Sequence, residues 1–174
     1  PRLWFLHERT VWRSFKALKQ LIMYRKNIYL EGRATFSMIK PDAVRKGYAG
    51  KILDRIIQAG FKVIACKITR MTMDDAKSFY DVHSDKPFFE DLAQFMTSGP
   101  IFALVLEKEN AVEDFRKLIG ATNPANAQAG TIRKDFAESI QNNAVHGSDS
   151  NENAEIEAHF FFSTHDLIET RPGE

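Results

Sequence analysis

The chain has 174 residues, of which 44% are hydrophobic and 27% are charged, so one globular domain can bury a substantial core. The sequence lacks any apolar run near the ~18 residues that a membrane-spanning helix needs. Its single cysteine, Cys66, cannot form an internal disulfide, and we expect it to be buried because it lies in the apolar run FKVIACKI.

The net charge of +1 hides an uneven distribution of charged residues. Eight of the 24 Lys and Arg residues, but only two of the 23 Asp and Glu residues, lie in residues 1–33. Residues 34–174 are therefore mildly acidic, whereas nucleic-acid binders usually present a basic surface. We expect no stable nucleic-acid or membrane partner for residues 34–174.

Residues 1–33 form a basic, aromatic-rich segment in which Val11, Phe15, Leu18 and Ile22 follow helical spacing. Three interpretations stay open: a targeting or membrane-surface helix, an accessory helix packed on the body, or sequence without a role upstream of the domain. We therefore divide the chain into a basic amphipathic extension (1–33) and a main domain (34–174). We favour a cytoplasmic location over organelle targeting by the extension.

The main domain opens with an alternating segment, Ala34–Lys40, which predicts a strand that ends in a loop at Pro41. An apolar stripe over Gly47–Gly60 then predicts an amphipathic helix. The apolar run at 61–71 predicts a second strand.

Thr72 and Asp75 resemble a capping box, which predicts a helix over 72–83. The following pattern predicts helices over 87–99 and 110–120, separated by a buried central strand over 101–106.

Residues 121–145 show little periodicity, and a long segment of this kind is often a functional loop. A short fourth strand follows at 143–147, NAVHG. Ser148, Asp149 and Ser150 can then start a helix, and HFFFS at 159–163 suits a final extended segment.

This order of elements gives two βαβ halves. It predicts an α+β fold of ferredoxin-like βαββαβ type, with a four-stranded antiparallel sheet, helices on one face, and a long loop before the last strand.

His146 lies between that short strand and the helix start. A lone histidine is most often a surface or structural residue, and that interpretation stays open. Alternatively, its imidazole is largely neutral near pH 7 and can act as a base or as a nucleophile that holds a transferred group. The following helix start favours phosphate nearby, and Glu157 could orient the ring or be a solvated helix residue.

Three of the basic residues that precede His146 in the sequence are candidates for phosphate binding: Lys40, Arg116 and Arg133. Each suits an ordinary surface position, but together they could bind phosphate oxygens. Thr122 and Asn143 add neutral hydrogen-bond donors. A glycine phosphate cradle is excluded, because neither G-x-x-x-x-G-K-[ST] nor G-x-G-x-x-G occurs in the sequence.

Phe88 and Phe89 follow Pro87 in DKPFFEDL. Such a pair usually belongs to the core. One exposed ring could instead stack on a nucleobase, a contact that tolerates different bases.

Four segments in order resemble the nucleoside diphosphate kinase family. NAVHGSDS is similar to its active-site signature, and TFSMIKPDAV to its first strand. FYDVHSDKPFFEDL resembles its nucleotide-binding helices, and LIGATNPANAQAGTIRKDF its long loop. The resemblance runs from about Ala34 to Ser163.

The resemblance implies a role for each matching residue. His146 would become phosphohistidine, oriented by Glu157 and supported by Tyr80. Phe88 and Leu92 would hold the base. The remaining contacts to phosphate and sugar would come from Lys40, Arg116, Thr122, Arg133 and Asn143.

The implied activity is ping-pong transfer of the terminal phosphate of a nucleoside triphosphate such as ATP to nucleoside diphosphates. Mg²⁺ would be carried mainly by the nucleotide phosphates rather than by a protein metal site. The family also implies a homo-oligomer, either a tetramer or a hexamer. The alternative is a non-catalytic regulatory or binding member of the same fold.

Overall fold

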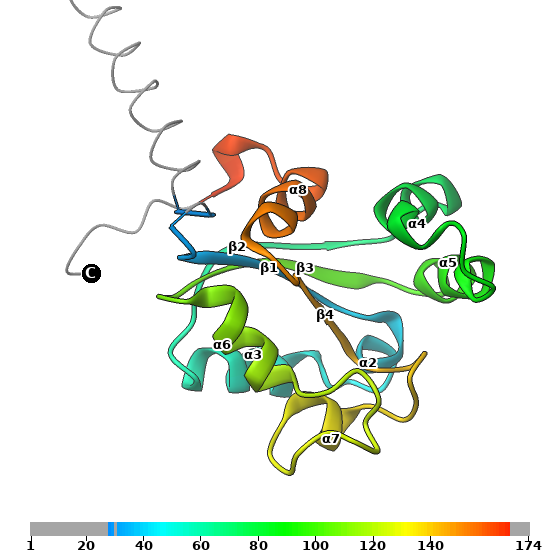
Figure 1. Cartoon of the computed structure of the whole chain (residues 1–174), viewed down its shortest axis with the longest axis horizontal. Coiled ribbons are helices and arrows are strands. Elements are labelled where there is room, and N and C mark those ends of the chain that lie inside the picture. The colour runs from blue at the N-terminus through cyan, green and yellow to red at the C-terminus, as the bar shows by residue number, and fades with distance from the viewer. Residues whose placement is uncertain (1–27, 30, 168–174) are drawn as a thin grey trace, which may run out of the picture.

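The computed structural model describes residues 28–29 and 31–167, which form one sheet with helices packed around it (Figure 1). The strands are β1 (Ala34–Ile39), β2 (Lys62–Thr69), β3 (Ile101–Glu107) and β4 (Val145–Gly147). Their order is β2-β3-β1-β4, and all neighbours are antiparallel. The predicted four-stranded, ferredoxin-like sheet is confirmed.

The helices follow the predicted order and differ from the prediction only in detail. They are α2 (Pro41–Arg45), α3 (Ala49–Gln58), α4 (Met73–Phe79), α5 (Phe89–Thr97), α6 (Ala111–Ile119), α7 (Ile132–Phe136) and α8 (Asn151–Phe161). Pro41 starts a short helix instead of a loop, since a proline suits the first helical position. The short helix α7 lies inside the segment without periodicity.

The predicted extended segment at 159–163 is wrong for its first three residues, because α8 continues through Phe161. The Phe161 ring stacks on Phe36 of β1 with a centroid distance of 5.4 Å. This contact packs the last turn of α8 against the sheet.

Helices cover both faces of the sheet, so the expectation of one covered face is wrong. Phe36 and Met38 of β1 pack in a core cluster with residues of α4, α5 and α8. Ile39 and Leu104 belong to a second cluster with residues of α2, α3, α6 and α7. Figure 1 shows α3 and α6 on the opposite side of the sheet from α8.

Cys66 is exposed, which contradicts the predicted buried thiol. It lies in β2, which is an edge strand. Ile64 and Ala65 are buried, whereas Ile68 further along the strand is 63% exposed. The helices therefore cover only the first part of this apolar run.

The chain joins the core before position 34. Ile28 and Tyr29 are buried in the same cluster as Ala154 and Ala158 of α8. The backbone N–H of Lys108 donates to the Arg33 carbonyl at 3.0 Å. The helical pattern of Val11, Phe15, Leu18 and Ile22, and the tail at 168–174, lie outside the described residues.

Strand β4 places His146 on the sheet. It pairs with β1 so that His146 lies opposite Met38. The next residue is Gly147, and only glycine fits there, because a Cβ would come within 2.8 Å of the Phe115 ring. A larger residue would push β4 away from α6, so the glycine fixes how closely the His146 strand approaches that helix.

Candidate active site

A cavity of about 600 Å³ opens beside β4. All ten residues that the sequence and the family resemblance single out line it, although they come from widely separated segments of the chain. These residues are Lys40, Tyr80, Phe88, Leu92, Arg116, Thr122, Arg133, Asn143, His146 and Glu157.

His146 and Glu157 form a pair at one wall of the cavity. His146 Nε2 lies 2.9 Å from Glu157 Oε2, and both side chains are less than one-fifth exposed. A carboxylate only accepts hydrogen bonds, so neutral His146 carries its proton on Nε2 and keeps the lone pair on Nδ1. The ring is also packed edge-on against Phe79, at a centroid distance of 5.4 Å. The arrangement fixes both the tautomer and the orientation of the imidazole.

Ser148 contributes to this pair, a role that its position in the sequence does not reveal. Its hydroxyl donates to Glu157 Oε2 at 2.6 Å. The predicted helix start is confirmed at Ser150, whose hydroxyl accepts from the backbone N–H of Asn153 at 3.0 Å. The two serines therefore have different partners, and only contacts in the folded chain distinguish them.

Lys40 is a buried cation at the end of β1, 6% exposed, and its Nζ donates to Asn143 Oδ1 at 2.8 Å. Burial and, to a smaller extent, the charge of nearby Arg133 lower the pKa of Lys40 to about 8, while Asp42 acts in the opposite direction. Lys40 is therefore held in a site whose electrostatics favour an anion.

Arg133 is 8% exposed and is held by two backbone carbonyls. Its Nη1 donates to Gly120 O at 2.9 Å and its Nη2 to Val145 O at 3.1 Å. Burial and then the charge of Arg116 lower the pKa of Arg133 to about 10. The guanidinium stays charged at neutral pH, and its Nε has no hydrogen-bond partner among the described residues. Arg133 and Arg116 are two cations held close together, which indicates an anion site.

Tyr80 is buried beside His146, with ring centroids 6.2 Å apart. Burial, followed by the charge of Glu157, raises the pKa of the Tyr80 phenol above its usual range. The hydroxyl therefore keeps its proton, and it has no hydrogen-bond partner within the described part of the chain. It is available to donate into the cavity.

The mouth of the cavity is apolar. Phe88 is 50% exposed and its ring packs against His83 at 5.8 Å, so it is not the core residue that a Phe pair usually is. Ile140, 59% exposed, lines the mouth as well. The Gln141 side chain donates to Asp91 O at 3.4 Å and links this rim to α5. Ile140 and Gln141 lie in the segment without periodicity, where the sequence gives no signal for them.

The described residues contain no group of three or more His, Cys, Asp or Glu side chains that could hold a metal ion. A metal at this site would therefore need ligands from a bound phosphate compound and water.

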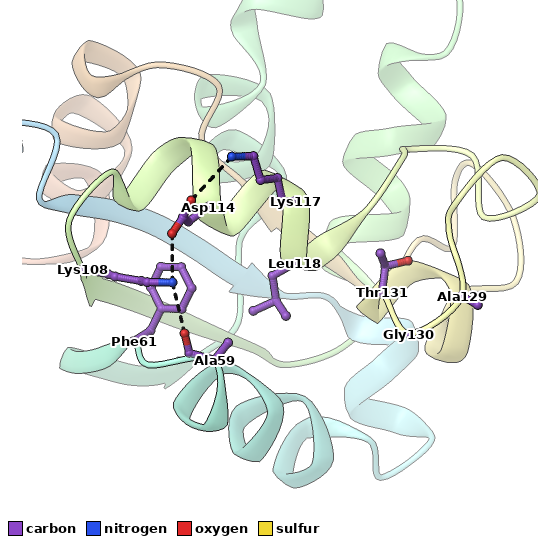
Figure 2. Close-up of a pocket in the computed structure, with 9 residues that line it drawn as sticks. All are labelled: Ala59, Phe61, Lys108, Asp114, Lys117, Leu118, Ala129, Gly130 and Thr131. Atoms are coloured by element: carbon purple, nitrogen blue, oxygen red, sulfur yellow. Dashed lines mark hydrogen bonds and ion pairs between the residues drawn. The ribbon is translucent and has the colours of Figure 1, made fainter.

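A second hollow, of about 440 Å³, lies between α6, Phe61 and the loop at 129–131 (Figure 2). Its cations are already paired. Lys108 Nζ donates to Asp114 at 2.9 Å and to the Ala59 carbonyl at 3.2 Å, and Lys117 also pairs with Asp114. These lysines differ from Lys40 and Arg133 in the cavity beside β4, whose hydrogen bonds go to neutral oxygens rather than to carboxylates.

Comparison with known proteins matches residues 33–167 to the family model described as nucleoside diphosphate kinase. A protein of that name from Flavobacterium psychrophilum is 59% identical over 74% of this chain and 93% of its own length. Another, from Campylobacter curvus, is 58% identical over 76% of this chain and 97% of its own length.

Solved structures agree with the sequence comparison. The nucleoside diphosphate kinase of Aquifex aeolicus superposes with a TM-score of 0.77 and 44% identity, covering 78% of this chain and 99% of its own. That of Halobacterium salinarum, determined in complex with CDP, has a TM-score of 0.77 and 39% identity, covering 80% of this chain and 93% of its own.

Proposed function

The chain belongs to the nucleoside diphosphate kinase family and is a nucleotide phosphotransferase, and we propose that it works through a phosphohistidine on His146. The observation that carries this proposal is the His146–Glu157 pair, which leaves Nδ1 as the nitrogen with a free lone pair, at a cavity that Lys40 and Arg133 also line.

In the first half-reaction, the Nδ1 lone pair attacks the terminal phosphorus of a nucleoside triphosphate. The N–P bond forms while the bond to the bridging oxygen breaks, and the nucleoside diphosphate leaves with those electrons. A second nucleoside diphosphate then attacks the phosphohistidine and regenerates neutral His146. Glu157 accepts the hydrogen bond from the His146 Nε2–H throughout and stabilises positive charge on the ring.

The charged residues of the cavity suit the phosphates. Phosphoryl transfer depends mainly on positioning and on neutralising charge. Arg133 and Lys40 are held in place by hydrogen bonds, and Arg116 and Thr122 line the same cavity. We assign these four residues to the phosphate chain, with Asn143 and Lys40 also reaching the sugar.

The base would lie at the apolar mouth, between the half-exposed Phe88 ring and Leu92. Stacking does not read the edges of a base, so we expect many nucleosides to be accepted. A divalent metal, which we take to be Mg²⁺, would be held by the nucleotide phosphates and would offset their charge.

We propose that the protein is a homo-oligomer, either a tetramer or a hexamer. An exposed edge strand supports this, since β2 presents Ile68 and Cys66 to solvent. Light scattering on the purified chain distinguishes the two assemblies.

We also propose a cytoplasmic location and no stable nucleic-acid or membrane partner for the main domain, residues 34–174. Among the described residues, no helix has the length and apolar character needed to cross a membrane. The role of the extension at 1–33 is tested by deleting residues 1–27, which spares the buried Ile28 and Tyr29, and comparing location and activity with those of the full chain.

The test of the catalytic proposal is incubation of the protein with Mg²⁺ and ATP labelled on its terminal phosphate. We expect an acid-labile phosphoprotein that transfers its label to added nucleoside diphosphate, and no label on H146A. A wild-type protein that takes up no label would contradict the proposal. The non-catalytic alternative is not favoured, because the complete residue set lines one cavity.

A further inference from the structure

A strained turn precedes the nucleophile. Ala144 has a φ of 66°, a left-handed conformation that non-glycine residues rarely adopt. The backbone N–H of Val145 donates to the Asn143 carbonyl at 2.8 Å, which closes a three-residue γ-turn centred on Ala144. The turn lies between Asn143 and His146, and both of these residues line the cavity.

Both backbone polar groups of Ala144 are bound by the segment that follows β1. Its N–H donates to Asp42 Oδ2 at 3.0 Å, and its carbonyl accepts from the backbone N–H of Lys40 at 2.8 Å. Ala144 is fully buried and Asp42 is 3% exposed, so water does not replace these contacts.

Asp42 itself is unusual, because it is a buried carboxylate in the first turn of a five-residue helix. Its Oδ1 has no hydrogen-bond partner within the described residues. The bond to Ala144 is thus the one hydrogen bond that the structure gives its side chain among those residues. A buried carboxylate with so little local support requires an explanation.

We propose that Asp42 is a positioning residue whose carboxylate holds the Ala144 turn, and through it directs Asn143 and His146 into the cavity. The inference rests on the proposed function, since it concerns how the phosphate-accepting histidine is placed. Asp42 lies 102 positions from Ala144 in the sequence, so the contact exists only in the folded chain.

The experiment compares D42A with D42N, because an asparagine amide oxygen can still accept the Ala144 N–H. D54A serves as the control, since Asp54 is an exposed carboxylate on α3. A fourth variant, D42A/A144G, places glycine at the turn, where it adopts a positive φ without strain. The rate of phosphoprotein formation from ATP and the melting temperature are measured for each variant.

We expect D42A to slow phosphoprotein formation by at least about tenfold, the effect of leaving a buried N–H without its acceptor. D42N should keep most of the wild-type rate. The double variant D42A/A144G should form phosphoprotein several-fold faster than D42A does. A D42A rate equal to that of D54A, or a D42A defect that neither D42N nor A144G relieves, overturns the inference.

A second measurement does not depend on activity. Hydrogen exchange of the Ala144 amide should accelerate in D42A and stay slow in D42N, because only the first lacks an acceptor. Equal protection in both variants overturns the inference even if the enzyme is active. A wild-type protein that takes up no phosphate overturns the proposed function instead, and the exchange data still decide the role of Asp42.

Discussion

Arg55 of α3 forms an ion pair with Asp135 of α7, the short helix that carries Arg133. The same guanidinium donates to the Gly130 carbonyl at 3.3 Å and lies 5.0 Å from the centroid of the Phe136 ring. One residue of α3 thus contacts α7 and the loop before it, and fixes the segment that positions Arg133.

R55A should therefore weaken nucleotide binding as well as lower stability. The ion pair is about one-third exposed, so we expect a stability loss of about 1 kcal/mol together with the cation–π contact. Greater freedom of α7 should raise the Kd for ADP by about threefold to tenfold. Calorimetric titration and thermal melting measure the two effects. K117A is the control, because the ion-pair partners of Lys117 lie within its own helix. Equal Kd values for both variants would contradict the prediction.

Nucleotide binding should weaken as the pH rises through about 8. The folded-state pKa of Lys40 is lowered to about 8 by burial and by Arg133, so the free protein loses this charge above that pH. By pH 9 only about one-tenth of Lys40 is protonated, and the Kd for ADP should be up to about tenfold higher than at pH 7. Titrations across this range test the prediction. In K40R the charge persists, so its alkaline loss of affinity should be smaller. A wild-type Kd that is constant from pH 7 to 9 is the contrary result.

Ser148 and Ser150 should respond differently to the same substitution. S148A removes the hydrogen bond to Glu157 and should slow phosphoprotein formation by about fivefold to tenfold. S150A removes the N-cap of α8 and should cost about 1 kcal/mol of stability with little direct effect on chemistry. Rates and melting temperatures of the two variants separate these effects, and identical profiles would show that the two serines do not differ in role.

G147A and G50A should shift stability in opposite directions. A Cβ at Gly147 would lie 2.8 Å from the Phe115 ring and 3.1 Å from Ile119, so we expect a loss of about 1–3 kcal/mol and displacement of His146. A Cβ at Gly50 in α3 meets nothing within 4 Å, so alanine there should stabilise the helix by about 0.5–1 kcal/mol. Denaturant unfolding measures both changes. A G147A protein as stable as the wild type would show that β4 can move away from α6 at little cost.

The sequence was informative where its signals were local. The capping box at Thr72 and Asp75 forms as predicted, and the apolar run at 101–106 is the strand β3. The candidate site residues were identifiable because they lie in short motifs, and the fold places them around one cavity.

What the sequence could not reveal depends on contacts between distant segments. The apolar run around Cys66 resembles a central strand, and only the strand order shows that β2 lies at the edge. The bond between Asp42 and Ala144 joins positions with no shared motif or spacing. Helix α7 is five residues long, too short to show a period, and it is stabilised by its contacts with Arg55 rather than by its own composition.

The pairing of β4 with β1 also bears on how the enzyme matures. Met38 and His146 lie opposite each other although 108 positions separate them, and Glu157 follows still later in the chain. During synthesis, a nascent chain cannot assemble the nucleotide site until nearly the whole domain has left the ribosome. Nucleotide in the cell would thus stabilise the finished protein against unfolding, while its early folding proceeds without assistance from the substrate.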